Sequence, residues 1–366
     1  MEFEDLRPTV LEINLENFRH NVRIIQDYIG SNNKIMPVIK ANAYGTYINK
    51  NLDVINEFDI LAVATVTEGI EIRNLGYEKE IFVLNQPYLD EVKNITKFNI
   101  AVGVSSIDFV KRLGESKEKV KIHIEIGTGM GRTGIHPNRA DEFCELIKSY
   151  GNIEVEGIYT HLSVADIDEE YTKKQLASFE RAVEVTKKHF NLKYIHSMAS
   201  SGIINFSKEN EISNLVRPGI ILYGYDVDES LKGKLEIKPV AKLKSKVIFM
   251  KEVKEGTSIG YGRSYITTKQ TKVGTVPLGY ADGFRRTFSN KGKVYVNGKM
   301  CDIIGKVCMD SFMVDLTDVE DAKVGNDVII FDEEHIFLDD LAKMCDTINY
   351  ELLCTISERV KRKFVE

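Results

Sequence analysis

Apolar positions along the first part of the chain follow two alternating periods. Short apolar runs are separated by segments in which apolar residues recur every three or four positions. The runs predict strands near residues 35–39, 60–65, 81–85, 98–103, 119–126, 154–160, 193–197 and 214–216. The segments between them predict helices such as 66–75, 89–96, 106–113, 140–150 and 168–190, after a first helix over 15–29. Strands that alternate with helices in this way, with no glycine-rich dinucleotide fingerprint after the first strand, predict an α/β fold, a (β/α)8 TIM-like barrel.

The pattern changes near residue 237. From there the apolar runs are short, rich in β-branched residues and separated by turn signals such as Asn297-Gly298. Strands are predicted within 240–253, 273–278, 293–296, 300–307, 312–315 and 326–331, with helical turns near 338–344 and 349–357. We therefore expect a barrel over residues 1–236 and a mostly β C-terminal domain over 237–366. Residues 11–14 alternate like a strand. Residues 1–14 are therefore compatible with two positions, as part of the barrel or packed on the β domain.

Composition narrows the class of protein. The chain has 366 residues, of which 43% are hydrophobic and 28% charged, and a net charge of -6, which gives no basic surface for nucleic acid. Its five cysteines are odd in number and lack CxxC spacing, as is typical of reduced thiols in the cytoplasm. The first eight residues lack the apolar core of a signal peptide, and no run is long enough to cross a membrane. We expect a cytoplasmic protein without a membrane partner and without a metal site.

Lys40 closes the first predicted barrel strand and precedes a run of small and turn-forming residues. An ammonium group that an apolar strand partly desolvates loses its proton more easily and can attack an aldehyde. The alternative is that Lys40 only extends to the rim of the sheet. Barrel enzymes carry their chemistry at the C-terminal ends of their strands, and four other cationic or imidazole side chains follow such ends here. These are Arg132, His161, His196 and Arg217.

The same rim carries donors suited to a phosphate. Gly219 and Ile220 offer backbone N–H groups after the eighth strand, and Ser200 opens the helix after the seventh, where barrels usually hold phosphate. Tyr44, close to Lys40 in sequence, adds a phenolic donor. A phosphorylated aldehyde held by a lysine is pyridoxal 5'-phosphate, which is the cofactor we expect.

A set of motifs across both predicted domains gives a more specific indication. They are VIKANAYG (38–45), IGTGMGRTGI (126–135), GIYTHLSVAD (157–166), VRPGIILYG (216–224), IGYGRSY (259–265), PLGYADG (277–283), GKVCMD (305–310) and TINYELLCTISERV (347–360). In this order the set resembles the alanine racemase family over essentially the whole chain. The resemblance implies a pyridoxal-phosphate-dependent isomerase that converts L-alanine to D-alanine for peptidoglycan.

The resemblance also implies roles for individual residues. Lys40 would hold the cofactor and act as one acid–base group, and Tyr261 of the partner subunit in a homodimer with shared active sites would act as the other. Two bases on opposite faces of Cα give racemisation directly, because one removes the proton and the other returns one. Arg217 would face the pyridine nitrogen with His196 as its support, and His161 would connect Tyr261 with Arg217.

The remaining roles concern the cofactor and the amino-acid substrate. The resemblance puts Arg132 on the cofactor's phenolic oxygen and the substrate carboxylate, and Met309 beside that carboxylate. It puts Tyr280, Asp310 and Tyr350 around the substrate and the phosphate. The phosphate would be surrounded by Tyr350 together with Tyr44, Ser200, Gly219 and Ile220. His123, inside the fifth strand, is expected to be structural.

Several positions depart from the family's usual pattern. Glu125 stands where many members carry a carbamylated lysine, and we expect its carboxylate to keep the contact with Arg132 without modification. Gly127, Thr46-Tyr47 and Ala199 differ as well. These changes leave alanine, serine or a broader range of amino acids open as substrates. A decarboxylase of the same fold or a non-catalytic cofactor-binding protein would also be compatible with the barrel, but Tyr261 argues against both.

Overall fold

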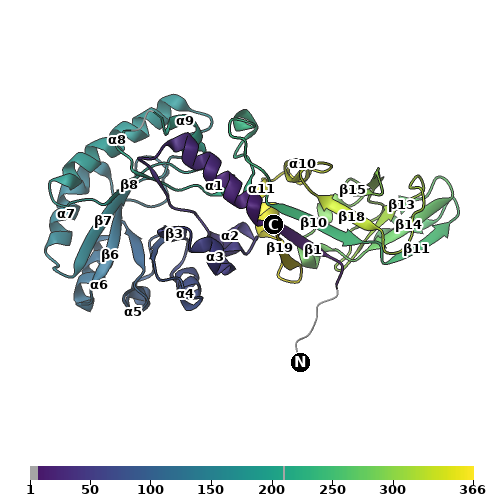
Figure 1. Ribbon diagram of the computed structural model, residues 1–366, viewed down its shortest axis with the longest axis horizontal. Coiled ribbons are helices and arrows are strands. Elements are labelled where there is room, and N and C mark those ends of the chain that lie inside the picture. Colours follow the sequence, from purple (N-terminus) through teal and green to yellow (C-terminus); the bar gives the residue numbers. More distant parts are fainter. Residues whose placement is uncertain (1–6, 209–210) are drawn as a thin grey trace. The chain divides into compact units, whose positions relative to one another are not determined.

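The computed structural model describes residues 7–208 and 211–366, so the first six residues of the segment 1–14 lie outside the described residues. The chain divides into two compact units, which Figure 1 traces in colours that follow the sequence. The barrel unit comprises His20–Ala43 and Tyr47–Ile237. The β unit comprises Tyr44–Thr46, Lys238–Glu366 and the described residues up to Arg19.

Eight parallel strands form the wall of the barrel unit. They are β2 (Lys34–Ile35), β3 (Ile60–Val63), β4 (Glu80–Val83), β5 (Ala101–Val104), β6 (Val120–Glu125), β7 (Ile153–Tyr159), β8 (Tyr194–His196) and β9 (Leu215–Val216). Strands β3 to β8 pair in sequence order, and β2 pairs with β9. Single bridges, Val38 with Ala62 and Ala199 with Arg217, close the wall on either side of that pair. The predicted (β/α)8 barrel is confirmed.

Helices cover the outside of this wall, which explains why its strands read as continuous apolar runs. In Figure 1 they form the outer layer around the strands. They are α3 (Leu52–Ile55), α4 (Val66–Asn74), α5 (Val92–Lys97), α6 (Ile107–Ser116), α7 (Ala140–Lys148), α8 (Glu169–Lys187) and α9 (Ser200–Phe206), and the first predicted helix is α1 (Leu15–Ile29). Thr65, Ser106 and Asp168 each cap a helix by accepting a backbone N–H three residues ahead.

The β unit contains three sheets. The largest has six strands in the order β16-β15-β18-β10-β1-β19, and the others are β11-β14-β17 and β12-β13. The strands are β1 (Val10–Asn14), β10 (Ala241–Lys246), β11 (Phe249–Val253), β12 (Ser258–Ile259), β13 (Tyr265–Ile266), β14 (Thr271–Val276), β15 (Lys293–Val296), β16 (Lys299–Asp302), β17 (Phe312–Asp315), β18 (Asp327–Phe331) and β19 (Lys361–Val365). Two helices, α10 (Leu338–Met344) and α11 (Asn349–Cys354), complete it. The predicted strand region 240–253 is thus two strands.

Segments from opposite ends of the chain pair within the six-stranded sheet. Strand β1 runs antiparallel to β10 and parallel to β19, with Val10 opposite Lys361. Leu11 and Ile13 of β1 are fully buried, which fixes its register. The sequence pattern does not predict β19, because its run of basic residues has the composition of a solvated tail. On an edge strand, such charges discourage further pairing with another chain.

Gly45 is required by a close approach within the β unit. Its φ is +79°, and a Cβ there would lie 2.3 Å from the carbonyl oxygen of Leu353. We expect Gly45→Ala to lower the free energy of unfolding by more than about 2 kcal/mol, because it adds a clash to the left-handed backbone. Gly298→Ala is the control: φ is +83° with open space around the added carbon, so only the backbone cost of about 1 kcal/mol applies. Equal losses in urea unfolding would show that the contact is unimportant.

Candidate active site

Lys40 lies just after the segment that closes the barrel wall at Val38. The residues that follow it, from Ala41 to Tyr44, all have φ between 52° and 55°, which is the left-handed region. Each non-glycine residue in that region costs about 1 kcal/mol or more. The turn after Lys40 must therefore be stabilised by its surroundings.

Glu68 supplies part of that stabilisation. Its Oε1 accepts the backbone N–H of Ala41 at 2.7 Å, and its Oε2 accepts that of Ala64 at 2.8 Å. Glu68 also takes part in the capping box at the start of α4. One carboxylate therefore ties the residue after Lys40 to the end of the neighbouring strand β3. Sequence reasoning missed this residue, and the small residues after Lys40 were the only signal of the turn.

Arg217 is buried inside the barrel and held by three donated hydrogen bonds. Its Nη1 donates to Nδ1 of His196 at 2.7 Å and to the His196 carbonyl oxygen at 2.9 Å, and its Nη2 donates to the carbonyl oxygen of Thr160 at 2.7 Å. A guanidinium has five N–H groups, so two have no acceptor among the described residues. No carboxylate in the described part of the chain lies within ion-pair distance of it. Burial lowers the pKa of Arg217 to about 10, which still leaves it charged at neutral pH.

His196 connects Arg217 to a second buried imidazole. Its Nε2 lies 2.8 Å from Nδ1 of His123, and both rings are fully buried. The ring of Phe82 stacks on His123 at 4.2 Å, and the ring of Tyr159 lies parallel to His196 at 5.1 Å. The structure places His196 against Arg217. It also adds His123 to the same hydrogen-bond chain, which sequence reasoning missed.

His161 follows Thr160 at the rim of the barrel. Burial is the main cause that lowers the pKa of His161 to about 3, and the positive charges of Arg217, Arg132 and Lys40 add to it. Such charge effects require these four side chains to lie in one neighbourhood. His161 is therefore neutral at pH 7 and able to accept a hydrogen bond.

The loop after β6 carries Arg132, which is exposed. At its base, the buried Glu125 accepts a hydrogen bond from Thr133 Oγ1 at 2.6 Å. Burial raises the pKa of Glu125, and the Thr133 hydrogen bond and the charge of Arg132 oppose that rise. The expected direct contact between Glu125 and Arg132 is absent from the hydrogen bonds and ion pairs of the described residues. Arg132 acts on Glu125 through its charge, and Glu125 Oε2 has no hydrogen-bond partner among the described residues.

The residues expected at the phosphate within the barrel unit come together after β8 and β9. The hydroxyl of Ser200, the first residue of α9, accepts the backbone N–H of Gly219 at 3.1 Å. Ser200 thus keeps its own O–H as a donor. Ile220, the next residue, is fully buried and begins a 3-10 turn. The bridge between Ala199 and Arg217 fixes these two segments side by side.

The β unit holds Tyr261 between two glycines that both have a φ of 68°. This turn leaves the Tyr261 side chain 71% exposed. Tyr280 and Met309 are also exposed, at 44% and 53%. A cavity of about 420 Å³ adjoins Tyr261 and is lined by Phe249, Lys251, Ser258, Ile259, Gly260, Val273, Thr275, Cys308 and Met313.

Two further pairs in the β unit involve predicted residues. Asp310 accepts a hydrogen bond from Arg359 Nη2 at 2.7 Å, a partner that sequence reasoning did not foresee. The rings of Tyr44 and Tyr350 lie 6.0 Å apart. Burial, followed by the nearby Tyr350 and Cys354, raises the pKa of Tyr44, so its hydroxyl stays protonated. Tyr44 therefore carries a phenolic O–H at neutral pH.

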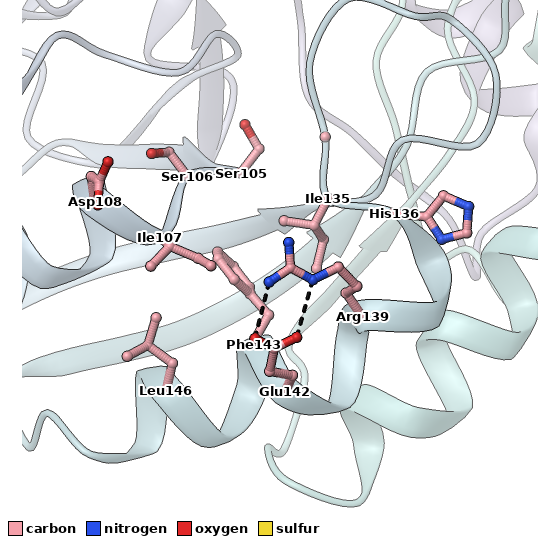
Figure 2. Close-up of a pocket in the computed structure, with 11 residues that line it drawn as sticks. Ser105, Ser106, Ile107, Asp108, Ile135, His136, Arg139, Glu142, Phe143 and Leu146 are labelled. Carbon is pink, nitrogen blue, oxygen red and sulfur yellow. Dashed lines mark hydrogen bonds and ion pairs between the residues drawn. The ribbon is translucent and has the colours of Figure 1, made fainter.

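A larger cavity, of about 560 Å³, lies in the barrel unit between α6 and α7 (Figure 2). Its floor is apolar, with Ile107, Phe143 and Leu146. Figure 2 also shows an ion pair between Arg139 and Glu142, which lie three residues apart at the start of α7; its length is 2.9 Å. None of the predicted site residues lines it, so it is separate from the arrangement around Lys40 and Arg217.

Two negative findings apply to the described residues. No three His, Cys, Asp or Glu side chains among them gather in a group able to hold a metal ion. No helix in the part that the structure describes has the length and apolar character needed to cross a membrane.

Family models match both parts of the chain. The model described as alanine racemase, N-terminal domain, matches residues 13–227, and the model described as alanine racemase, C-terminal domain, matches residues 240–364. Among curated relatives, alanine racemase 2 of Caldanaerobacter subterraneus subsp. tengcongensis is 38% identical over 383 residues, covering 99% of this chain and 96% of the relative. The alanine racemase of Clostridium novyi is 39% identical, covering 100% and 97%.

Solved structures agree with these matches. The alanine racemase of Clostridium difficile 630 has a TM-score of 0.92 and 37% identity, covering 99% of this chain and 97% of that one. An alanine racemase from Bacillus anthracis with bound L-Ala-P has a TM-score of 0.92 and 30% identity, covering 100% and 96%. The similarity therefore extends over both units.

Proposed function

We propose, from the premise that this chain belongs to the alanine racemase family, that it is a pyridoxal-phosphate-dependent racemase that interconverts L- and D-alanine. The observation that carries the proposal is Arg217, which is buried, lacks a carboxylate partner among the described residues and retains two N–H groups. Such a group suits a ring nitrogen that accepts a hydrogen bond. Curated relatives similar over nearly the whole chain are named for alanine, which supports it as the substrate.

The chemistry of the side chains fits pyridoxal phosphate. Lys40 would hold its aldehyde carbon, Arg132 its phenolic oxygen and Arg217 its ring nitrogen, with His196 as support. When bound, the cofactor stabilises the electron pair that remains on Cα after a proton leaves. Because Arg217 donates and cannot accept, it favours the unprotonated ring nitrogen. An unprotonated ring nitrogen draws the electron pair from Cα into the ring only weakly. This favours return of a proton to Cα over other reactions.

The phosphate of the cofactor would bind to neutral donors. In the barrel unit these are the Ser200 hydroxyl and the backbone N–H of Ile220. The N–H of Gly219 donates to Ser200 Oγ in this structure and would turn from it to the phosphate. Tyr44 and Tyr350 would add phenolic donors, which is supported by the protonated state of the Tyr44 hydroxyl. Hydrogen bonds from such groups to an ionised phosphate are charge-assisted, and therefore stronger than those between neutral groups.

Lys40 and Tyr261 would move the proton on opposite faces of Cα. One would remove it, and the other would deliver a proton to the far side, which inverts the carbon. A phenol is a weak acid and needs a nearby acceptor to act as a base. His161 would orient the phenol without taking its proton, because its pKa is about 3. The positive charge of Arg217, to which His161 would link the phenol, favours the phenolate.

The substrate carboxylate would be bound by Arg132, with Met309 beside it and Tyr280 and Asp310 around the substrate. Arg132 is exposed and has no carboxylate partner within ion-pair distance among the described residues, so its charge is available. Asp310 would act together with Arg359, to which it is hydrogen-bonded. The buried Glu125 would stabilise the loop through Thr133 and balance the cationic charge nearby.

We also propose a homodimer in which Tyr261 completes the active site of the partner subunit. The exposed position of Tyr261 supports this, since a catalytic phenol functions only when substrate and cofactor enclose it. Ile248, Phe249 and Ile266 are exposed apolar residues of the same unit and favour burial by a second copy. A soluble cytoplasmic enzyme that supplies D-alanine for peptidoglycan fits the five free cysteines.

Exchange of the Cα proton in D2O tests the proposed reaction. L-alanine, L-serine and L-lysine are incubated separately with the holoenzyme, and loss of each Cα proton is followed by ¹H NMR. We expect alanine to exchange at least about tenfold faster than serine, because a pocket fitted to one side chain discriminates by about 1–3 kcal/mol. Enzyme treated with borohydride, which fixes the cofactor to Lys40, is the control and should exchange none of them.

The outcomes separate the parts of the proposal. Faster exchange of serine would refute alanine as the preferred substrate and leave the racemase assignment in place. Exchange of no amino acid would refute the racemase itself. Recovery of the borohydride-fixed cofactor on a lysine other than Lys40 would refute the assignment of that residue.

A further inference from the structure

The hydrogen bond between Arg217 and His196 determines where His196 carries its proton. Every nitrogen of a guanidinium is a donor and none is an acceptor. Arg217 Nη1 lies 2.7 Å from Nδ1 of His196, so that nitrogen must present a lone pair. Neutral His196 therefore carries its hydrogen on Nε2.

The same reasoning continues to the next ring. Nε2 of His196 lies 2.8 Å from Nδ1 of His123, so the hydrogen between them belongs to His196 and His123 accepts it. His123 then carries its own hydrogen on Nε2, which has no hydrogen-bond partner among the described residues. The chain of donors runs in one direction, from Arg217 through His196 to His123.

Both rings are neutral at physiological pH. Burial, followed by the charges of Lys193, Arg217 and Lys121, lowers the pKa of His123 to about 3. Burial, Arg217 and His123 lower the pKa of His196 well below its usual range. A second hydrogen on His196 would point its Nδ1–H at Arg217, and one on His123 would point its Nδ1–H at the Nε2–H of His196. The neutral tautomers with hydrogen on Nε2 are thus the ones that satisfy both contacts.

The backbone of the barrel is shaped to admit the ring of His123. A Cβ on Gly157, its partner on the neighbouring strand β7, would lie 2.8 Å from His123 Nδ1. The register between β6 and β7 shifts just before His123, so that Gly157 and not Glu156 faces it. Phe82 stacks on the His123 ring at 4.2 Å. This position is therefore fitted to an imidazole in one orientation.

We propose that His123 is a positioning residue that acts through His196. By accepting the His196 Nε2 hydrogen, it keeps the Nδ1 lone pair directed at Arg217 and so holds the two remaining N–H groups of Arg217 in place. The part that concerns cofactor binding rests on the proposed function, in which those groups meet the ring nitrogen. In this hydrogen-bond chain the Nε2–H of His123 is left without an acceptor among the described residues.

The tautomers can be observed directly in the wild-type holoenzyme labelled with ¹⁵N at its seven histidines. Long-range ¹H–¹⁵N correlation distinguishes Nδ1–H, Nε2–H and doubly protonated rings. We expect His123 and His196 to remain neutral, with hydrogen on Nε2, from pH 5 to pH 8. A hydrogen on Nδ1 of either ring, or titration of either within that range, would overturn the proposal. This measurement does not depend on activity.

Two substitutions separate positioning from packing. In His123→Asn the amide oxygen can take the place of Nδ1 as an acceptor, whereas His123→Leu fills similar space without one. We expect His123→Leu to lower kcat and weaken cofactor binding about tenfold or more and to shift the cofactor absorbance, because misplacement of Arg217 disturbs the ring nitrogen. His123→Asn should stay within about threefold of wild type, consistent with a retained acceptor.

The variants and the spectra together decide the question. Equal losses in both variants, or no loss in either, would overturn the positioning role. If His123→Leu does not fold, the wild-type tautomers and the His123→Asn result remain decisive. If the tautomers are as expected but the wild type exchanges no amino acid, the proposed function fails while the hydrogen-bond chain stands.

Discussion

Lys40→Gln should abolish racemisation of alanine, with kcat lowered at least about 10⁴-fold. The substitution removes two functions at once, the amine that holds the cofactor and one of the two groups that move the proton. Formation of D-alanine measures the loss of turnover. The cofactor that stays covalently bound to the denatured protein after borohydride reduction measures attachment and should disappear.

Lys34→Gln is the matched control for this experiment. Lys34 is exposed and begins β2, whereas Lys40 follows the end of the same barrel segment. Loss of the same charge at the start of the strand should leave kcat and the amount of covalently bound cofactor within about twofold of wild type, since surface substitutions away from special contacts have small effects. Activity above about one per cent in Lys40→Gln would contradict the catalytic role of this residue.

Tyr261→Phe should lower net racemisation by about 10²- to 10⁴-fold while leaving Cα exchange of one enantiomer close to wild type. L- and D-alanine have equal free energies in water, so net conversion must fall equally in both directions. The asymmetry is therefore visible only in exchange with D2O, where the enantiomer whose proton faces Lys40 loses it without inversion. Each enantiomer is followed separately by ¹H NMR.

Tyr265→Phe provides the corresponding control. Tyr265 lies four residues further along the chain and packs against the buried cluster of Ile259, Val273 and Ile304. Removal of its hydroxyl should leave exchange of both enantiomers unchanged. Equal, mild losses of exchange for L- and D-alanine in Tyr261→Phe would instead indicate that one base serves both faces.

The barrel was predictable because its signals are local. Each strand of the wall is a short apolar run, such as Ile60–Val63, whose neighbours are caps and turns. The position of Lys40 and Arg217 at strand ends follows from the same pattern, since parallel strands present their C-terminal ends at one rim. The motif resemblance then added roles that spacing alone could not provide.

The features that were missed depend on partners far away in sequence. The left-handed turn after Lys40 is stabilised by Glu68, which is distant in the chain. The position of His123 in the hydrogen-bond chain depends on a register shift opposite Gly157. Asp310 meets Arg359 only after the β unit has folded. None of these contacts leaves a periodic signal, so hydrophobic patterning could not reveal them.

The parallel pairing of β1 with β19 has a consequence for the order of events during synthesis on the ribosome. Strand β1 is made well before its parallel neighbour Lys361–Val365, because the two segments lie far apart in the sequence. One edge of β1 therefore remains without its native neighbour while the intervening residues are synthesised. The native pairing at this edge of the six-stranded sheet therefore cannot form before Lys361–Val365 has been synthesised.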